Sequence, residues 1–165
     1  MSSPPFTIRH VHAEDQDWIL GLVREWGADF IVSRGRKIFP TRLPGFCAVG
    51  LAGEGLGLAT YEIAGAECQL VTLHALRPYQ GIGTALTAAV REAAAAASCR
   101  RLWLITTNDN LDALRFYQRR GFELVAVHRD FREVARRLKP SIPPVGTFGI
   151  PIRDEIELEL RLDRF

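Results

Sequence analysis

Several residue types are scarce in this chain of 165 residues, and each shortage excludes a class of protein. There are only three cysteines, Cys47, Cys68 and Cys99, and their odd number and wide spacing match no zinc or redox motif. We therefore expect buried free thiols in a reducing compartment, which favours a cytoplasmic location. The formal net charge is only +2, which is too small to indicate nucleic acid as a partner.

Long apolar runs are also absent. No stretch of roughly 18 consecutive apolar residues occurs, so we expect neither a transmembrane helix nor a membrane partner. The first residues lack the charged and then apolar pattern of a signal peptide. The four histidines do not cluster, apart from His10 and His12, so nothing in the sequence points to a metal.

The rest of the composition is that of an ordinary globular protein. Apolar residues make up 47% of the chain and charged residues 24%. A chain of this length can bury one good core, so we expect residues 1–165 to form a single domain.

Alternation and helical periodicity divide the chain into strands and helices. Strands are predicted at residues 6–10, 46–52, 56–64, 67–76, 101–107, 122–128 and 156–162. Helices are predicted at residues 15–26, 83–97, 111–120 and 130–138. Asp15 or Glu14 is expected to cap the first helix, with Trp18, Leu22 and Trp26 or Val23 on its buried face.

The connections between these elements predict the topology. Glycine-containing turns at 53–55 and 65–66 are typical of hairpins, so residues 46–76 should form an antiparallel meander. The strand–helix–strand unit over residues 67–107 makes its two strands parallel. We therefore predict an α/β (α+β) fold with a mixed central sheet of six to seven strands, flanked by four to five helices.

The remaining segments are predicted to be less regular. Residues 27–45 are punctuated by Gly, Arg and Pro and are expected to be a mobile stretch. Residues 140–151 should form a proline-rich loop, and the last strand should close the sheet.

Residues 73–86 carry the most informative pattern, an apolar strand followed by an Arg-Pro turn, a glycine pair and a long helix. Gly81 and Gly83 allow the backbone to come close to a ligand because they lack a Cβ atom. The first N–H groups of the helix have no partner within it and lie at the positive end of its dipole. Such a helix start suits a pyrophosphate. On this segment alone, a plain strand-to-helix turn explains the glycines equally well.

A second pattern follows at residues 102–128, which read as strand, Asn-rich turn, helix, Gly-Phe and strand. Together the two segments resemble the GNAT-type N-acetyltransferase superfamily. Its first signature is Gln or Arg, two residues, Gly, one residue, and Gly or Ala, which residues 80–85 match. Its second is Asn, two residues, Ala, two residues, Phe-Tyr, three residues and Gly-Phe, which Asn110 to Phe122 match. The resemblance is sharp over residues 70–128 and loose over the helix, loop and final strand of 129–165.

The resemblance implies acetyl-coenzyme A (acetyl-CoA) as the co-substrate, entering where the two central parallel strands splay apart. Backbone groups of Leu73, His74 and Ala75 would pair with its pantetheine arm like an added strand, and one N–H near Leu73 would face the thioester oxygen. Asn110 occupies the superfamily's position for a side-chain contact to the cofactor. The pyrophosphate would be held by Gln80, Gly81, Ile82, Gly83, Thr84 and Ala85.

The same resemblance makes Tyr117 the general acid, because it lies seven residues after Asn110. It would protonate the departing thiolate after direct attack of the amine through a tetrahedral intermediate. A core aromatic residue on a packed helix is the alternative interpretation of Tyr117.

A general base is harder to find in the sequence. A lysine-like amine is only about 0.04% neutral at pH 7, whereas an α-amine is roughly 14% neutral, so the first needs proton removal far more. Members that act on protein N-termini often carry Glu five residues before the Asn, where this chain has Ile105. Glu67 is our candidate base, and Glu62, His74 and a water chain are the alternatives.

The sequence therefore predicts a cytoplasmic acyltransferase, an N-acetyltransferase that moves the acetyl group of acetyl-CoA to a primary amine. The acceptor, a small-molecule or peptide amine, stays open, as does a homodimer formed through the last strand. The rival hypothesis is a non-catalytic acetyl-CoA-binding sensor or interaction module. Nucleotide-binding loops are excluded because no Gly-Lys-Ser/Thr follows the glycines, and Leu86 stands where a dinucleotide fingerprint needs Gly or Ala.

Overall fold

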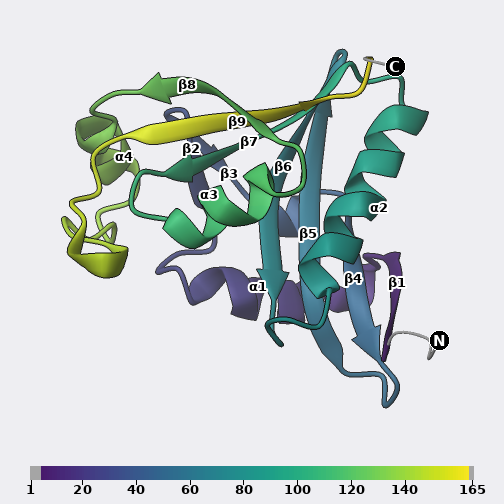
Figure 1. The fold of residues 1–165 in the computed structure, drawn as a ribbon. Helices are drawn as coiled ribbons and strands as arrows, with labels where there is room; N and C mark the ends of the chain where they lie inside the picture. Colours follow the sequence, from purple (N-terminus) through teal and green to yellow (C-terminus); the bar gives the residue numbers. More distant parts are fainter. Residues whose placement is uncertain (1–4, 164–165) are drawn as a thin grey trace.

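The computed structural model describes residues 5–163 and has the predicted fold class (Figure 1). A seven-stranded mixed sheet has the strand order β1-β4-β5-β6-β7-β9-β8. Its strands are β1 (Phe6–His10), β4 (Gly45–Gly50), β5 (Gly55–Ala64), β6 (Glu67–Ala75), β7 (Arg101–Thr107), β8 (Glu123–His128) and β9 (Glu155–Arg161). The α-helices are α1 (Gln16–Arg24), α2 (Ile82–Ala96), α3 (Leu111–Gln118) and α4 (Arg132–Leu138). Short 3-10 turns lie at Ala13–Asp15, Pro40–Arg42 and Thr147–Gly149.

The meander and the parallel pair are confirmed. β4, β5 and β6 are antiparallel neighbours, and β6 pairs in parallel with β7. Within residues 5–163, no helix has both the length and the apolar character needed to cross a membrane.

The segment predicted to be mobile contains a hairpin instead. β2 (Ile31–Ser33) and β3 (Arg36–Ile38) pair antiparallel. Its turn residues Arg34 and Gly35 have φ angles of 50° and 73°, which fits a turn whose twist matches that of the flanking strands. Arg-Gly is a weaker hairpin signal than Asn-Gly, which is why the sequence did not reveal the hairpin.

The last strand does not close the sheet, which is a second correction. β9 lies between β7 and β8 and is antiparallel to both, so β8 is the edge strand. Leu158 is fully buried, with Leu104 opposite it on β7 and Leu124 on β8. Alternation in the sequence indicates the two faces of a strand but not how many neighbours it has.

Helix α1 also departs from expectation. The Asp15 carboxylate accepts hydrogen bonds from the Arg9 guanidinium at 2.8 and 2.9 Å and from the His12 N–H at 2.7 Å, so it does not cap α1. Trp26 lies beyond the helix and is 44% exposed. The buried residues of α1 are Ile19, Leu22 and Val23.

Helices cover both faces of the sheet. α2 and α3 lie on one face, and α1 and the hairpin lie behind the sheet in the view of Figure 1. The α2 residues Ile82, Leu86 and Val90 belong to the larger core cluster. A smaller cluster joins α1 to Cys47 and Leu58. All three cysteines are buried free thiols, as predicted.

The two central parallel strands separate soon after they meet. β6 and β7 pair only from Glu67 to Gln69, opposite Arg101 to Trp103, although both strands continue. The β5–β6 ladder changes register close to this point, so that Thr72 and Leu70 face adjacent β5 residues and Val71 is the extra residue of a bulge. A bulge bends its strand and increases the local twist. A gap therefore opens between the carboxyl-terminal ends of β6 and β7.

Candidate active site

The start of α2 presents free backbone donors. Gly81 precedes the helix with φ of 79°, a left-handed conformation that glycine adopts without a Cβ penalty. The first helical hydrogen bond runs from Ala85 N–H to the Gly81 carbonyl. The N–H groups of Ile82, Gly83 and Thr84 have no acceptor among residues 5–163. They lie where the helix dipole favours an anion.

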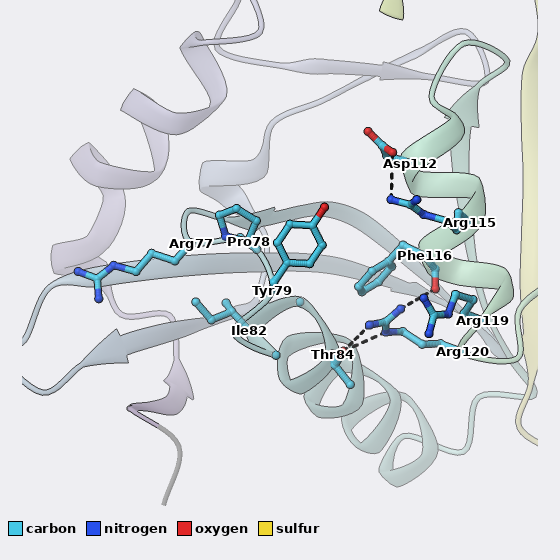
Figure 2. A pocket seen from close by; sticks show the side chains of 13 residues that line it. Arg77, Pro78, Tyr79, Ile82, Thr84, Asp112, Arg115, Phe116, Arg119 and Arg120 are labelled. Carbon is cyan, nitrogen blue, oxygen red and sulfur yellow. Dashed lines mark hydrogen bonds and ion pairs between the residues drawn. The ribbon is translucent and has the colours of Figure 1, made fainter. Parts of the chain in front are cut away.

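A groove of about 490 Å³ adjoins these donors (Figure 2). One wall is the loop after β6 with the first turn of α2, and the other is α3. Its cationic residues are Arg77, Arg115, Arg119 and Arg120. In Figure 2, Arg115 of α3 and Arg119 and Arg120, which follow the helix, gather on one wall, whereas Arg77 points away from them.

Arg120 joins the two walls of the groove. Its guanidinium donates to Thr84 Oγ1 at 2.6 and 3.0 Å and to the Phe116 carbonyl at 2.8 Å. It also lies 3.5 Å from the centroid of the Phe116 ring. Arg115 is paired with Asp112 at 3.2 Å, while the Arg119 side chain makes no ion pair with the described residues. The groove therefore carries a surplus of positive charge.

The two glycines serve different purposes. A Cβ atom on Gly81 would meet nothing within 4 Å, so its φ angle, rather than lack of space, requires glycine. A Cβ atom on Gly83 would lie 3.1 Å from Phe116 Cζ. Gly83 thus makes room for the Phe116 ring, a packing role that the sequence did not predict.

The other residues of the first signature are less central. Gln80 is exposed in the loop and is not part of the groove wall. Ala85 has its N–H engaged in the helix, so it cannot donate to a ligand.

Asn110 caps α3. Its Oδ1 accepts from the Ala113 N–H at 3.2 Å and its Nδ2 donates to Thr106 Oγ1 at 3.2 Å. A role in helix capping therefore accounts for this asparagine without a ligand.

Tyr117 is buried near the end of α3. It is 8% exposed and packs edge-on against Phe116 and Phe122. Burial raises the pKa of its phenol far above the usual value, against a smaller opposing effect of Arg120. Gly121, with φ of 89°, ends the helix as predicted, since Phe122 N–H bonds to the Tyr117 carbonyl at 3.1 Å.

The end of β6 borders the gap. Leu73 packs against the larger core cluster, and Ala75 lines the groove. His74 is 9% exposed and stacks on Trp26 with ring centroids 4.2 Å apart. Neither of its ring nitrogens has a hydrogen-bond partner among residues 5–163, and burial lowers its pKa to about 4.

Glu67 lies apart from all these residues. It begins β6, at the opposite end from Ala75, and its carboxylate pairs with Arg101 at 2.9 Å. Glu62 is likewise paired, with Arg36 at 2.6 Å.

A second cavity, of about 570 Å³, lies on the other side of the gap. Trp26, the hairpin strand β2, the end of β7 and the loop after α4 form its walls. The end of β6 borders the groove and the end of β7 borders this cavity. The two hollows share no lining residue.

Arg115, Arg119 and Arg120 were not identified from the sequence, and neither was the second cavity. Arg115 and Arg119 are four residues apart on a predicted helix, so their shared face was a readable signal. The second cavity has no such signal, because its walls come from segments that are distant in the sequence.

Comparison with protein families gives a match to the description "Acetyltransferase (GNAT) family" over residues 10–122. The uncharacterized protein YdhI of Bacillus subtilis (strain 168) is 47% identical over 135 residues, which cover 81% of this chain and 83% of that protein.

Two solved structures have a similar fold. An IAA acetyltransferase from Bacillus cereus ATCC 14579 gives a TM-score of 0.71 at 19% identity, covering 95% of this chain and 99% of that one. A GNAT family acetyltransferase from Elizabethkingia anophelis with acetyl-CoA bound also gives 0.71 at 19% identity, covering 97% and 100%. At 19% sequence identity, these similarities support a shared fold and nothing more specific.

Proposed function

Because this chain belongs to the GNAT acetyltransferase family, we propose that it catalyses N-acetylation, the transfer of the acetyl group of acetyl-CoA to a primary amine. The observation that carries the proposal is the early separation of β6 and β7 beside an anion-ready helix start. The gap offers strand edges, and the groove next to it offers positive charge. A long, amide-containing ligand with a diphosphate at one end needs both.

The residues present fit such a ligand. The free N–H groups of Ile82, Gly83 and Thr84 would hold the diphosphate, with Arg119 adding charge-assisted hydrogen bonds. The backbone from Leu73 to Ala75 lacks a ladder partner on the β7 side and would pair with the amide-containing arm.

Bound acetyl-CoA would supply an activated acetyl thioester whose sulfur departs as a thiol. A backbone N–H near Leu73 would stabilise negative charge on the carbonyl oxygen, since such donors need no reorganisation. Tyr117 would hold a proton on its phenol oxygen for the departing sulfur. Its raised pKa keeps that proton in place at neutral pH.

We propose that no single carboxylate removes the proton of the amine. Glu67 and Glu62 are engaged by arginines, and Glu67 is at the wrong end of β6. Water would carry the proton away, which favours acceptors with a substantial neutral fraction at the working pH.

Calorimetric titration with acetyl-CoA, coenzyme A and ATP tests the binding part of this proposal. We expect micromolar binding of both coenzymes, and a loss of about tenfold in affinity for Arg119→Gln. Arg91→Gln is the matched control, because Arg91 is an exposed residue of α2 outside the groove. Failure of the wild-type protein to bind either coenzyme would overturn the proposal.

Thiol release in the presence of an amine panel tests the catalytic part. Acetyl-CoA-dependent turnover with any amine supports an enzyme. Tight binding with no turnover across the panel would instead favour a non-catalytic acetyl-CoA sensor.

A further inference from the structure

The second cavity combines apolar walls with two buried charged residues. Its apolar lining comes from Trp26, Ile31, Ile105, Phe131, Ile142 and Ile152. Lys139 and Glu155 also line it and are 8% and 2% exposed. Charged side chains are seldom buried to this degree without a partner.

Glu155 already has its partner. Its Oε2 accepts from the Arg34 backbone N–H at 3.1 Å, and its Oε1 lies 3.4 Å from the Arg34 guanidinium. Glu155 thus holds the turn of the β2–β3 hairpin, and the charge of this carboxylate is compensated.

Lys139 has no such partner. It ends α4, where its backbone N–H bonds to the Ala135 carbonyl. Its side chain makes no hydrogen bond or ion pair with residues 5–163. Burial lowers its pKa, which is the effect expected of an ammonium group without a counter-ion. The other acidic residue of the lining, Glu25, is exposed where the chain leaves α1.

We propose that this cavity binds the acceptor, and that the acceptor is a primary amine carrying a carboxylate on an apolar body, with Lys139 as the counter-ion of the carboxylate. The inference rests on the proposed acetyl transfer. The carboxylate compensates the charge of Lys139, which has no partner among residues 5–163. The apolar walls take the hydrocarbon part, and the amine faces the gap bordered by the end of β7.

Paired probes in which a neutral group replaces the carboxylate test the inference. Phenylalanine is compared with phenylalaninamide, and 6-aminohexanoate with hexylamine, by thiol release. We expect the acid of at least one pair to have a kcat/KM at least tenfold above its neutral partner. Lys139→Met should abolish this preference mainly through KM, whereas Lys139→Arg should retain most of it. Lys37→Met, at the only other lysine of the chain, is the control.

Calorimetry on the coenzyme-A-loaded protein measures the affinity of the cavity for each probe without turnover. The same pairs should bind with the same order of preference, so the wild-type result decides even where a Lys139 variant fails to fold. Equal use and equal binding of acid and neutral probes would overturn the inference and leave acetyl transfer intact. If the wild-type protein did not bind the coenzyme at all, that result would instead contradict the proposed function.

Discussion

Tyr117 is held in its protonated form by its surroundings, and its ring is fixed by two aromatic neighbours. Tyr117→Phe keeps the ring and removes the acid, so turnover should fall by about 10² to 10⁴, with acetyl-CoA affinity unchanged. Steady-state thiol release and calorimetry measure the two quantities. Tyr61→Phe is the control, since Tyr61 is another tyrosine with 8% exposure, on β5. Wild-type turnover in Tyr117→Phe would remove Tyr117 from the mechanism.

The raised pKa of Tyr117 has a consequence for pH dependence. The phenol stays protonated well above pH 10, so its deprotonation cannot lower the rate below that pH. We expect kcat/KM to rise as the amine acceptor loses its proton and then to level off. A decline between pH 8 and 10 in a range where the protein remains folded would contradict this assignment.

His74 links stability to acid. Burial lowers the pKa of His74 to about 4 in the folded chain, whereas an ordinary exposed histidine, as in the unfolded chain, has a pKa of 6.5. As the pH falls, the unfolded chain therefore binds this proton first. Above pH 6.5, His74 is neutral in both states and does not lower the free energy of unfolding. Between pH 6.5 and 4, its protonation in the unfolded chain lowers that free energy by at most about 3 kcal/mol. His74→Phe should remove this part of the acid loss in urea unfolding at pH 7, 5 and 4. His12→Gln, at an exposed histidine, should leave the wild-type pH dependence in place.

For single residues, the sequence predicted the positions of the motif residues better than the partners of individual side chains. Gly81 and Tyr117 were both identified by the spacing of the two signatures, whereas the left-handed conformation of Gly81 was not predicted. The absence of an acidic partner for Lys139 among the described residues could not be predicted, because it depends on which side chains several distant segments bring to the cavity.

Among the elements, α2 is placed by a glycine of the sheet. A Cβ atom on Gly57 of β5 would lie 2.6 Å from Ile82 Cγ2 and 2.8 Å from the His74 carbonyl oxygen. Gly57→Ala should therefore lower the free energy of unfolding by about 1–3 kcal/mol and weaken acetyl-CoA binding, because Ile82 opens α2. Denaturant unfolding and calorimetry test both effects.

Gly21→Ala is the matched control for this prediction. Gly21 is an exposed residue of α1, and a Cβ atom there would meet nothing within 4 Å. Alanine should raise the free energy of unfolding by about 0.5–1 kcal/mol, because glycine is unfavourable inside a helix. Destabilisation by both substitutions to the same extent would argue against a packing role specific to Gly57.

The elements that the sequence predicted and those it missed differ in kind. Strands such as β7 and helices such as α2 have a periodic pattern of apolar residues within their own sequence, so each can be predicted from that segment alone. The β2–β3 hairpin is only six paired residues around an Arg-Gly turn, and it is held by Glu155 from more than a hundred positions away. The insertion of β9 beside β7 is equally a matter of tertiary pairing.

For the whole molecule, the sequence predicted the order of β4, β5, β6 and β7, but neither the place of β1 beside β4 nor the order of the strands after β7. The meander and the right-handed strand–helix–strand unit leave few alternatives. After β7, two strands remain that can occupy either position. The choice of β9 as the inner one brings Glu155 opposite Thr107, and so supplies one wall of the second cavity.

The separate linings of the two hollows bear on kinetic order. Because the groove and the second cavity share no residue, each substrate should bind whether or not the other is present. We expect a random sequential mechanism. Coenzyme A should inhibit competitively against acetyl-CoA and noncompetitively against the amine, which initial-rate and product-inhibition plots distinguish. Parallel lines in double-reciprocal plots, the signature of an acetylated enzyme, would contradict it.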